Sequence, residues 1–217
     1  VIVNASFYNE SMAPITTPKI QFVLKDEEKK ISKMEFATYG EGYKLSLGKL
    51  KPGTIILPCD GEGRNAVHAA RQGWNVQAFD LSEAGKVKAD GLALKYDVKI
   101  SFQLQDAALA VYPAASADAV AIIYTHLPTP IRKELYKNII QWLKSGGKVI
   151  LETFCPDQLK NNSGGPKDID MLNTKGILSE DFKDLSIDYL EYVQIQLSEG
   201  KYHEGQADVI RMIATKL

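Results

Sequence analysis

The chain has 217 residues, of which 45% are hydrophobic and 24% are charged, as is typical of one globular domain with a substantial core. The formal net charge of −1 excludes the basic excess that marks nucleic-acid and anionic-membrane binding proteins. No apolar run approaches the roughly 18 residues that cross a bilayer, and the first residues lack the pattern of a signal peptide. Cys59 and Cys155 give no disulfide framework and no metal-ligand spacing, so a reduced, cytoplasmic setting is expected.

Residues 1–35 differ in composition from the rest of the chain. The stretch NESMAPITTPKI is rich in turn formers, and LKDEEKKISK is a charge run of the kind that usually forms a solvated face. We therefore expect an N-terminal extension or cover segment over residues 1–35, with one short strand or helix. The main domain is expected over residues 36–217.

From residue 52 onward, strand-like runs alternate with helical patterns. Strands are predicted at residues 53–58, 75–80, 99–106, 117–126 and 146–154, and helices at 63–73, 82–96 and 129–142. Such alternation favours right-handed βαβ units and a mostly parallel, doubly wound α/β sheet. The chain ends in two long strand-like runs, SIDYLEYVQIQL and ADVIRMIATKL, whose short connection predicts a hairpin and an antiparallel last strand.

Two helices have predicted starts and buried faces. Ser82 is the expected N-cap of the second helix, and Thr129 that of the third, with Pro130 at its first helical position. Spacing predicts apolar stripes at Ala84, Val87, Gly91 and Leu94 and at Ile131, Leu135, Ile139 and Trp142.

Residues 57–82, LPCDGEGRNAVHAARQGWNVQAFDLS, join the first predicted strand to the end of the second. Gly61 and Gly63 precede the first helix, and Asp80 ends the second strand. Ligands of open α/β sheets bind beyond the carboxyl ends of the strands, so this loop is a predicted nucleotide-type site.

The residue types in this loop favour one class of ligand. Cys59 replaces the first glycine of a dinucleotide loop, and Asp60 and Glu62 would place negative charge beside a pyrophosphate. S-adenosylmethionine carries no phosphate and has a cationic sulfonium and ammonium, which suit these acids. A dinucleotide oxidoreductase and a glycine turn without ligand are the alternatives.

Residues 36–217 resemble the class I S-adenosylmethionine-dependent methyltransferases, in particular a small-molecule branch that includes tellurite-resistance and thiopurine-type enzymes. The resemblance rests on GEGRNA followed by GWNVQAFDLS, on IIYTHLPTPIRKELYKNIIQWLKSGGKVILETF, and on GGPKDIDMLNTKGILSEDF. It implies a Rossmann-like, seven-stranded, mostly parallel sheet with an antiparallel C-terminal strand, and S-adenosyl-L-methionine as the cofactor.

The resemblance also implies residue roles. The loop would pass under the methionine part of the cofactor, Asp80 would hold the ribose, Leu81 would pack on the adenine, and Asp106 would accept from the adenine amino group. The full expected cofactor set is Cys59, Asp60, Gly61, Glu62, Gly63, Asn65, Asp80, Leu81, Ser82, Gln105, Asp106, Ala107 and Tyr124.

The acceptor side is less specific, because methyl transfer needs alignment and exclusion of water more than a catalytic group. His126, which follows the fourth strand, is the first candidate for a general base. Tyr124 and His203 are the other expected catalytic residues, and Tyr39, Thr125, Gly164 and Gly165 are expected at the substrate. No metal site is expected, and a nucleophilic Cys155 is not favoured because it follows the fifth strand.

The predicted function is methyl transfer from S-adenosylmethionine to a small-molecule acceptor. The family usually has an acid two residues before the first loop glycine, whereas this chain has Leu57 and Cys59 there. A catalytically inactive, cofactor-binding module with a regulatory role is therefore the alternative. No nucleic-acid or membrane partner is expected, and monomer and homodimer both stay open.

Overall fold

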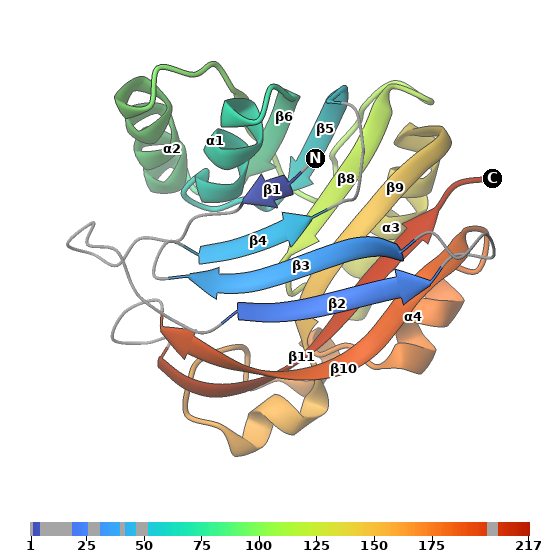
Figure 1. The fold of residues 1–217 in the computed structure, drawn as a ribbon. Coiled ribbons are helices and arrows are strands. Elements are labelled where there is room, and N and C mark those ends of the chain that lie inside the picture. The colour runs from blue at the N-terminus through green and yellow to red at the C-terminus, as the bar shows by residue number, and fades with distance from the viewer. Residues whose placement is uncertain (1, 5–18, 26–30, 40–41, 47–51, 199–203) are drawn as a thin grey trace.

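Two β-sheets organise the molecule (Figure 1). The computed structural model describes residues 2–4, 19–25, 31–39, 42–46, 52–198 and 204–217. The larger sheet has seven strands in the order β10-β11-β9-β8-β5-β6-β7. These strands are β5 (Thr54–Pro58), β6 (Asn75–Asp80), β7 (Ser101–Leu104), β8 (Ala117–Ile123), β9 (Leu143–Phe154), β10 (Ser186–Ser198) and β11 (Glu204–Thr215).

The topology of the large sheet confirms the predicted α/β fold. β5 pairs in parallel with β6 and β8, while β6 pairs in parallel with β7 and β8 with β9. β11 is antiparallel to both β9 and β10, as predicted for the last strand. The chain reverses its direction of travel across the sheet between β5 and β8, which is the switch point where such sheets bind ligands.

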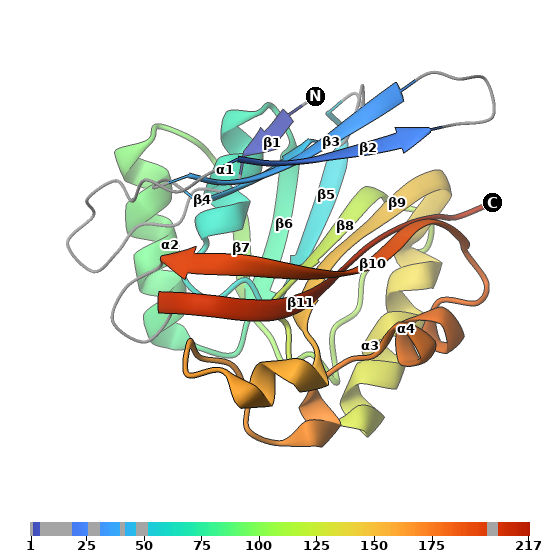
Figure 2. The same cartoon turned by 60° about the horizontal axis from the view of Figure 1, so that its bottom comes forward.

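Helices cover both faces of this sheet (Figures 1 and 2). Successive strand residues point to opposite faces, so Ile55 belongs to the core cluster that contains Ala66, and Ile56 to the cluster that contains Leu135. The first face carries α1 (Arg64–Arg71) and α2 (Glu83–Lys95), and the second carries α3 (Thr129–Trp142) and α4 (Lys175–Asp181). Two short 3-10 helices, η1 (Pro156–Lys160) and η2 (Ile169–Met171), connect β9 to α4.

The N-terminal part corrects one expectation. Instead of one short strand or helix, residues 1–35 contain β1 (Ile2–Asn4), β2 (Lys19–Lys25) and the start of β3 (Ile31–Tyr39), and β4 (Gly42–Ser46) follows. They form an antiparallel sheet in the order β1-β4-β3-β2, which lies over one face of the large sheet (Figures 1 and 2). β3 runs across the expected boundary between residues 35 and 36. The middle of the charge run that suggested a solvated face, residues 26–30, lies outside the described residues.

The buried face of α2 is a second correction. Ser82 is its N-cap as predicted, since its side chain accepts a hydrogen bond from Gly85 N at 3.0 Å. The predicted stripe is wrong, because Val87 and Leu94 are 67% and 83% exposed. The buried residues are instead Gly85, Ala89, Leu92 and Ala93.

Small residues occupy the buried face of α2 because the helix packs closely on the loop after β5. A Cβ built on Gly85 would lie 2.5 Å from the Gly61 carbonyl oxygen, and one on Gly63 would lie 2.3 Å from the Ala89 Cβ. Apolar periodicity could not identify this face, because the contact requires side chains that are small.

The two glycines of α2 are expected to respond oppositely to alanine. Gly85→Ala forces the helix away from the loop backbone and should lower the free energy of unfolding by about 1–3 kcal/mol. Gly91 is exposed and a Cβ there meets nothing within 4 Å, so Gly91→Ala should raise it by about 0.4–1 kcal/mol. Urea unfolding measures both, and destabilisation of equal size at the two positions would contradict the close approach.

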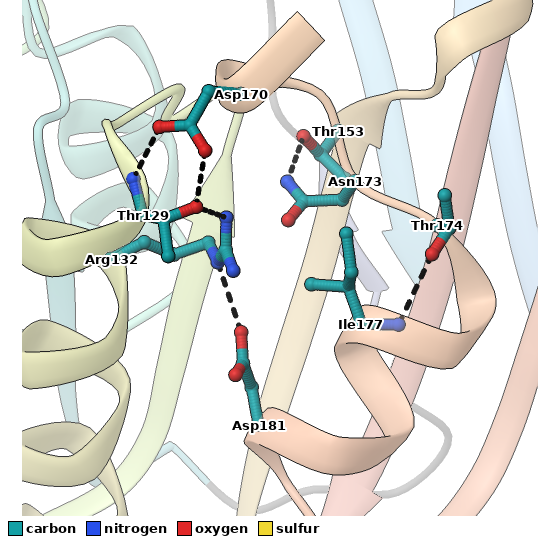
Figure 3. A network of polar contacts seen from close by, with 8 residues as sticks. All are labelled: Thr129, Arg132, Thr153, Asp170, Asn173, Thr174, Ile177 and Asp181. Atoms are coloured by element: carbon teal, nitrogen blue, oxygen red, sulfur yellow. Dashed lines mark hydrogen bonds and ion pairs between the residues drawn. The ribbon is translucent and has the colours of Figure 1, made fainter.

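The start of α3 is a third correction (Figure 3). Thr129 is the first helical residue rather than the N-cap, and its hydroxyl donates to Asp170 Oδ1 at 2.6 Å. Asp170 Oδ2 accepts from Thr129 N at 2.9 Å and so satisfies the first N–H of the helix. The partner comes from η2, 41 residues away, which local sequence signals do not reveal.

Candidate active site at the carboxyl ends of the strands

A cavity of about 480 Å³ opens at the carboxyl ends of β5, β8 and β9. The loop after β5 and the first turn of α1 form one side. The ends of β8, β9 and β10, together with the loop after η1, form the other. Its lining consists of Cys59, Asp60, Gly61, Glu62, Arg64, Asn65, Ile123, Tyr124, His126, Phe154, Gly165, Pro166 and Leu197.

The loop after β5 turns through three residues with positive φ at alternate positions. Cys59 has φ 52°, Gly61 has φ 58° and Gly63 has φ 75°. A left-handed conformation costs a residue with a side chain about 1–2 kcal/mol. Cys59 therefore adopts the conformation that the missing first glycine would take at lower energy, which explains how this loop forms without it.

Asp80 holds this loop against the end of β6. Its Oδ2 accepts from Gly61 N and its Oδ1 from Ser82 N, both at 2.9 Å. Asp60 N donates to the Phe79 carbonyl at 3.1 Å. The acid predicted to hold the ribose thus also orders the backbone of the predicted cofactor loop.

Asp60 caps the start of α1 from the cavity side. Its carboxylate accepts from Ala66 N at 3.0 Å and from the Asn65 side chain. Burial raises the pKa of Asp60 from 3.8 to about 7, although the Ala66 and Asn65 hydrogen bonds and the Arg64 charge oppose the rise. A cation placed here would favour the ionised carboxylate.

Acids from three successive strand ends surround Cys59. Burial, followed by the charges of Asp80, Asp106 and Asp60, raises the pKa of the Cys59 thiol from 9.0 to about 12. The thiol therefore stays protonated and does not act as a nucleophile. The carboxyl groups of Asp60, Asp80 and Asp106 therefore lie close enough to Cys59 to act on its thiol.

The end of β8 is shaped by a tyrosine in a strained conformation. Tyr124 has φ 51°, and its N–H donates to the Glu152 carbonyl at 2.8 Å. Strain of this kind is typical of functional sites. The next residue, Thr125, is buried and donates its hydroxyl to the Pro58 carbonyl at 3.1 Å, so it joins β8 to β5 rather than presenting the hydroxyl to the cavity.

His126 lines the cavity, but both of its ring nitrogens are engaged. Nε2 accepts from Phe154 N at 3.2 Å, and the ring also hydrogen-bonds to the Tyr124 backbone. Because Nε2 must be unprotonated to accept an N–H, it offers no free lone pair to a substrate. Burial lowers the pKa of His126 from 6.5 to about 4, so the ring is neutral at physiological pH.

Three aromatic rings make up the wall opposite the loop. The Phe154 ring lies 5.2 Å from the His126 ring, nearly parallel at 13°, and 4.8 Å from the Tyr124 ring. Leu197, Ile123 and Pro166 complete this side of the lining. The described part of this wall carries no charge.

The loop that carries Gly164 and Gly165 is fixed by Gln158. The buried Gln158 amide donates to Ser163 Oγ at 3.0 Å and to the Gly164 carbonyl at 2.9 Å, and its oxygen accepts from Asp208 N at 2.9 Å. Gly165 packs so closely that a Cβ would lie 2.7 Å from the Phe154 ring. The predicted substrate loop is therefore a wall attached to β11.

The structure brings some predicted site residues to the cavity and leaves others outside it. Those in the lining are Cys59, Asp60, Gly61, Glu62, Asn65, Tyr124, His126 and Gly165. Those outside it are Gly63, Asp80, Leu81, Ser82, Gln105, Asp106, Ala107, Thr125 and Gly164. His203 and the side chain of Tyr39 lie outside the described residues.

Sequence reasoning missed five lining residues. Phe154 ends a predicted strand at the ligand edge, so the strand-end rule could have found it. Arg64 directly follows the glycine loop, so its position was a signal that could have found it. Ile123, Pro166 and Leu197 carry no signal in the sequence that separates them from core residues.

Residues 58–147 match the model of a protein family described as a methyltransferase domain. This part of the chain is therefore similar to methyltransferase domains. This segment runs from the end of β5 into β9 and includes the loop, Asp80, Asp106 and His126. The resemblance drawn from the sequence is thereby confirmed.

A curated relative agrees with this family. Phosphoethanolamine N-methyltransferase 1 of Zea mays is 27% identical over 130 residues, which cover 54% of this chain. The match covers only 26% of the maize protein, so this chain spans about a quarter of its length.

Solved structures share the fold at low sequence identity. TehB from Haemophilus influenzae aligns with 100% of this chain and 99% of its own, with a TM-score of 0.64 and 14% identity. An S-adenosylmethionine-dependent methyltransferase from Methanosarcina mazei covers 77% of this chain and 94% of its own, with a TM-score of 0.63 and 18% identity. The chain therefore has the fold that the sequence predicted.

Two features are absent from the described ranges. No helix there is both long and apolar enough to cross a membrane. No group of three or more His, Cys, Asp or Glu side chains in those ranges could hold a metal ion.

Proposed function

We propose that this protein binds S-adenosylmethionine and transfers its methyl group to a small-molecule acceptor. The observation that carries the proposal is the convergence of Asp60, Asp80 and Asp106, from three successive strand ends, around a loop beside a cavity. Carboxylates there oppose a phosphate and favour a ligand that is cationic and rich in hydrogen-bond donors.

The residues present fit this cofactor. Asn65 Oδ1 and Gln105 Oε1 are buried acceptors without a hydrogen-bond partner in the described part of the chain. An ammonium, ribose hydroxyls and an adenine amino group are donors that such acceptors need. We assign the loop after β5 and Asn65 to the methionine end, Asp80 to the ribose, and Leu81, Gln105 and Asp106 to the adenine.

When bound, the cofactor supplies an electrophilic methyl group on a sulfonium. The protein's part is to align the acceptor with it and to exclude water. The wall of Tyr124, Phe154 and Leu197 suits that task, since its described residues are apolar or aromatic. His126, with Nε2 occupied by the Phe154 N–H, positions this wall, and we propose no general base in the described part of the site.

Calorimetric titration of the full chain with S-adenosylmethionine tests the cofactor, and release of S-adenosylhomocysteine on a panel of thiols, amines, hydroxyls and metalloid oxyanions tests the reaction. We expect micromolar binding and turnover of at least one acceptor class. Absence of micromolar binding would overturn the proposal. Binding without turnover on the whole panel would favour the alternative, an inactive regulatory module. Leu57 and Cys59, which stand where the family usually has an acid, motivate that alternative.

Binding of the cofactor is expected to release a proton from Asp60. With a pKa of about 7 in the free protein, this carboxyl is largely protonated near pH 6.5, and a neighbouring cation lowers its pKa. The proton must leave on binding, so affinity should rise from about pH 6 to about pH 8, where Asp60 is already ionised.

Calorimetry near pH 6.5 in buffers with different ionisation enthalpies measures that proton. The Asp60→Asn variant serves as the control, since it keeps the titration of the ligand's own amino group and removes that of Asp60. The same proton release in Asp60→Asn and in the unaltered protein would contradict the assignment.

Three further parts of the proposal rest on the sequence. They are a cytoplasmic location, a role for residues 1–35 as an extension or cover, and the absence of a nucleic-acid or membrane partner. Tyr39 and His203 remain proposed substrate and catalytic residues on the same basis.

A further inference from the structure

The outward face of α2 carries a row of exposed residues that neither the fold nor the proposed site uses. The row, here called the α2 stripe, consists of Ala84, Val87, Gly91 and Leu94. Val87 is 67% exposed and Leu94 is 83% exposed. α2 packs against the edge strand β7 and lies at the outer edge of the molecule in both views (Figures 1 and 2).

The α2 stripe lies opposite the face that attaches the helix to the sheet. The attached face consists of Gly85, Ala89, Leu92 and Ala93. Because successive residues of a helix are turned by about 100°, the two rows lie on opposite sides of the helix axis. Packing within the described part of the chain therefore accounts for one apolar face of α2 and leaves the other in solvent.

Gly91 stands in the middle of the α2 stripe without a packing reason in the described part of its own chain. A Cβ built on it would meet nothing within 4 Å, although glycine inside a helix is less stable than alanine. A residue without a side chain lets another backbone approach the helix closely. Gly91 therefore favours a second helix packed along the stripe.

Charged residues of opposite sign flank the α2 stripe. Glu83 and Asp90 follow one side of it, and Lys88 and Lys95 follow the other. In the heptad pattern of coiled coils, the stripe takes positions a and d, the acids position g and the lysines position e. Parallel helices bring each g residue next to the e residue that lies five positions later in the partner. Glu83 then meets Lys88 of a second copy. Asp90 meets Lys95 in the same way.

The same charges disfavour other occupants of the stripe. Two α2 helices in antiparallel orientation would bring acids next to acids and lysines next to lysines, which is destabilising. An anionic membrane surface would attract the lysines but repel Glu83 and Asp90. The pattern of charges thus selects a parallel second copy.

The flanking charges already have contacts within the chain, which a second copy can exchange at low cost. Lys88 pairs with Glu62, and Asp90 pairs with Lys86 at 2.8 Å. The side chains of Lys88 and Asp90 are 64% and 54% exposed. Ion pairs at such exposure contribute little to stability, so their replacement by pairs between two copies meets little resistance.

We propose that the α2 stripe binds the α2 stripe of a second copy of this chain, in a parallel pair of helices related by a two-fold axis. One helix from each copy makes a small contact, so the dimer is expected to be reversible rather than permanent. Both loops after β5 would lie at the same end of the pair, because the first turn of α2 approaches this loop at Gly85. The inference does not depend on the proposed function.

Sedimentation equilibrium of the full chain, from micromolar to submillimolar concentration, tests the dimer. We expect a reversible monomer–dimer equilibrium. Val87→Glu places a charge in the contact and should weaken association about 10-fold or more. Ile169→Glu is the matched control, because Ile169 is 65% exposed and belongs to η2, and it should leave the dissociation constant unchanged. A chain that stays monomeric throughout the range, or a dimer that Val87→Glu does not weaken, would overturn the proposal.

An exchange of charges tests the parallel orientation. Asp90→Lys places a lysine next to Lys95 of the second copy and should weaken the dimer roughly 3- to 10-fold, since the symmetry repeats the pair. The double variant Asp90→Lys/Lys95→Glu restores opposite charges and should recover most of this loss. Tighter association of Asp90→Lys would indicate antiparallel helices and overturn the proposed orientation. A double variant that associates no more tightly than Asp90→Lys would likewise count against it.

Discussion

Asp80→Ala is expected to weaken S-adenosylmethionine binding by about 100-fold or more, equivalent to about 2.7 kcal/mol. Two effects combine in this loss. The carboxylate that we assign to the ribose is removed, and the N–H groups of Gly61 and Ser82 lose an ionised acceptor at 2.9 Å. Hydrogen bonds to charged groups contribute about 1.5–3 kcal/mol each. Calorimetric titration of the purified variant gives the dissociation constant.

Two further variants control for this result. Asp90→Ala removes an exposed acid that pairs with Lys86 on α2 and should leave the affinity unchanged. Asp80→Asn keeps one acceptor oxygen and should give an intermediate loss. An unaltered dissociation constant in Asp80→Ala would rule out both the ribose contact and the dependence of the loop on this carboxylate.

The second large effect is expected on the free energy of unfolding, when one partner of the ion pair between α3 and α4 is removed (Figure 3). Arg132 Nε donates to Asp181 Oδ2 at 2.9 Å, and the two side chains are only 5% and 7% exposed. Asp181→Ala leaves the guanidinium buried with Thr129 Oγ1, at 3.2 Å from Nη1, as its described partner. Removing one partner of a buried pair typically costs about 3–5 kcal/mol, which urea unfolding measures.

The double variant Arg132→Met/Asp181→Leu tests the cause of this loss. It removes both charges and should recover most of the lost free energy, because two apolar side chains can replace a buried ion pair. Glu180→Ala, one residue earlier in α4, removes an exposed carboxylate that pairs with Lys183 and should leave the unfolding midpoint in place. A double variant as unstable as Asp181→Ala would show that packing, rather than the unpaired charge, causes the loss.

Local signals in the sequence located the strands and helices that carry the site. The spacing of apolar residues and the turn residues predicted the bounds of β5, β6, α1 and α2 to within a few residues. Ser82 was predicted as the N-cap of α2. Asp80 and Asp106 were identified because parallel strands present their carboxyl ends at one edge, and Asp60 because its charge disfavours a pyrophosphate in the loop. These features depend on residues that are close in the sequence, or on the alternation of strands and helices along the chain.

Long-range contacts decided the points where sequence reasoning went wrong. The buried face of α2 was set by the close approach of Gly85 to the Gly61 carbonyl, and the cap of α3 came from Asp170. A long-range contact also fixes His126, whose Nε2 accepts a backbone N–H of Phe154, a residue 28 positions away. None of these partners has a fixed spacing in the chain.

The loop after β5 shows which features follow from residue types and which depend on packing between distant segments. Residue identity alone predicts an acidic turn between a strand and a helix, because the charge of a side chain follows from its type. Such a turn opposes a phosphate and favours a cationic ligand. Only the tertiary structure decided that Cys59 takes the left-handed conformation of the missing glycine and that Asp80 holds Gly61. It also decided that Arg64 faces the cavity beside Asp60, since conformation and approach follow from packing between segments distant in the chain.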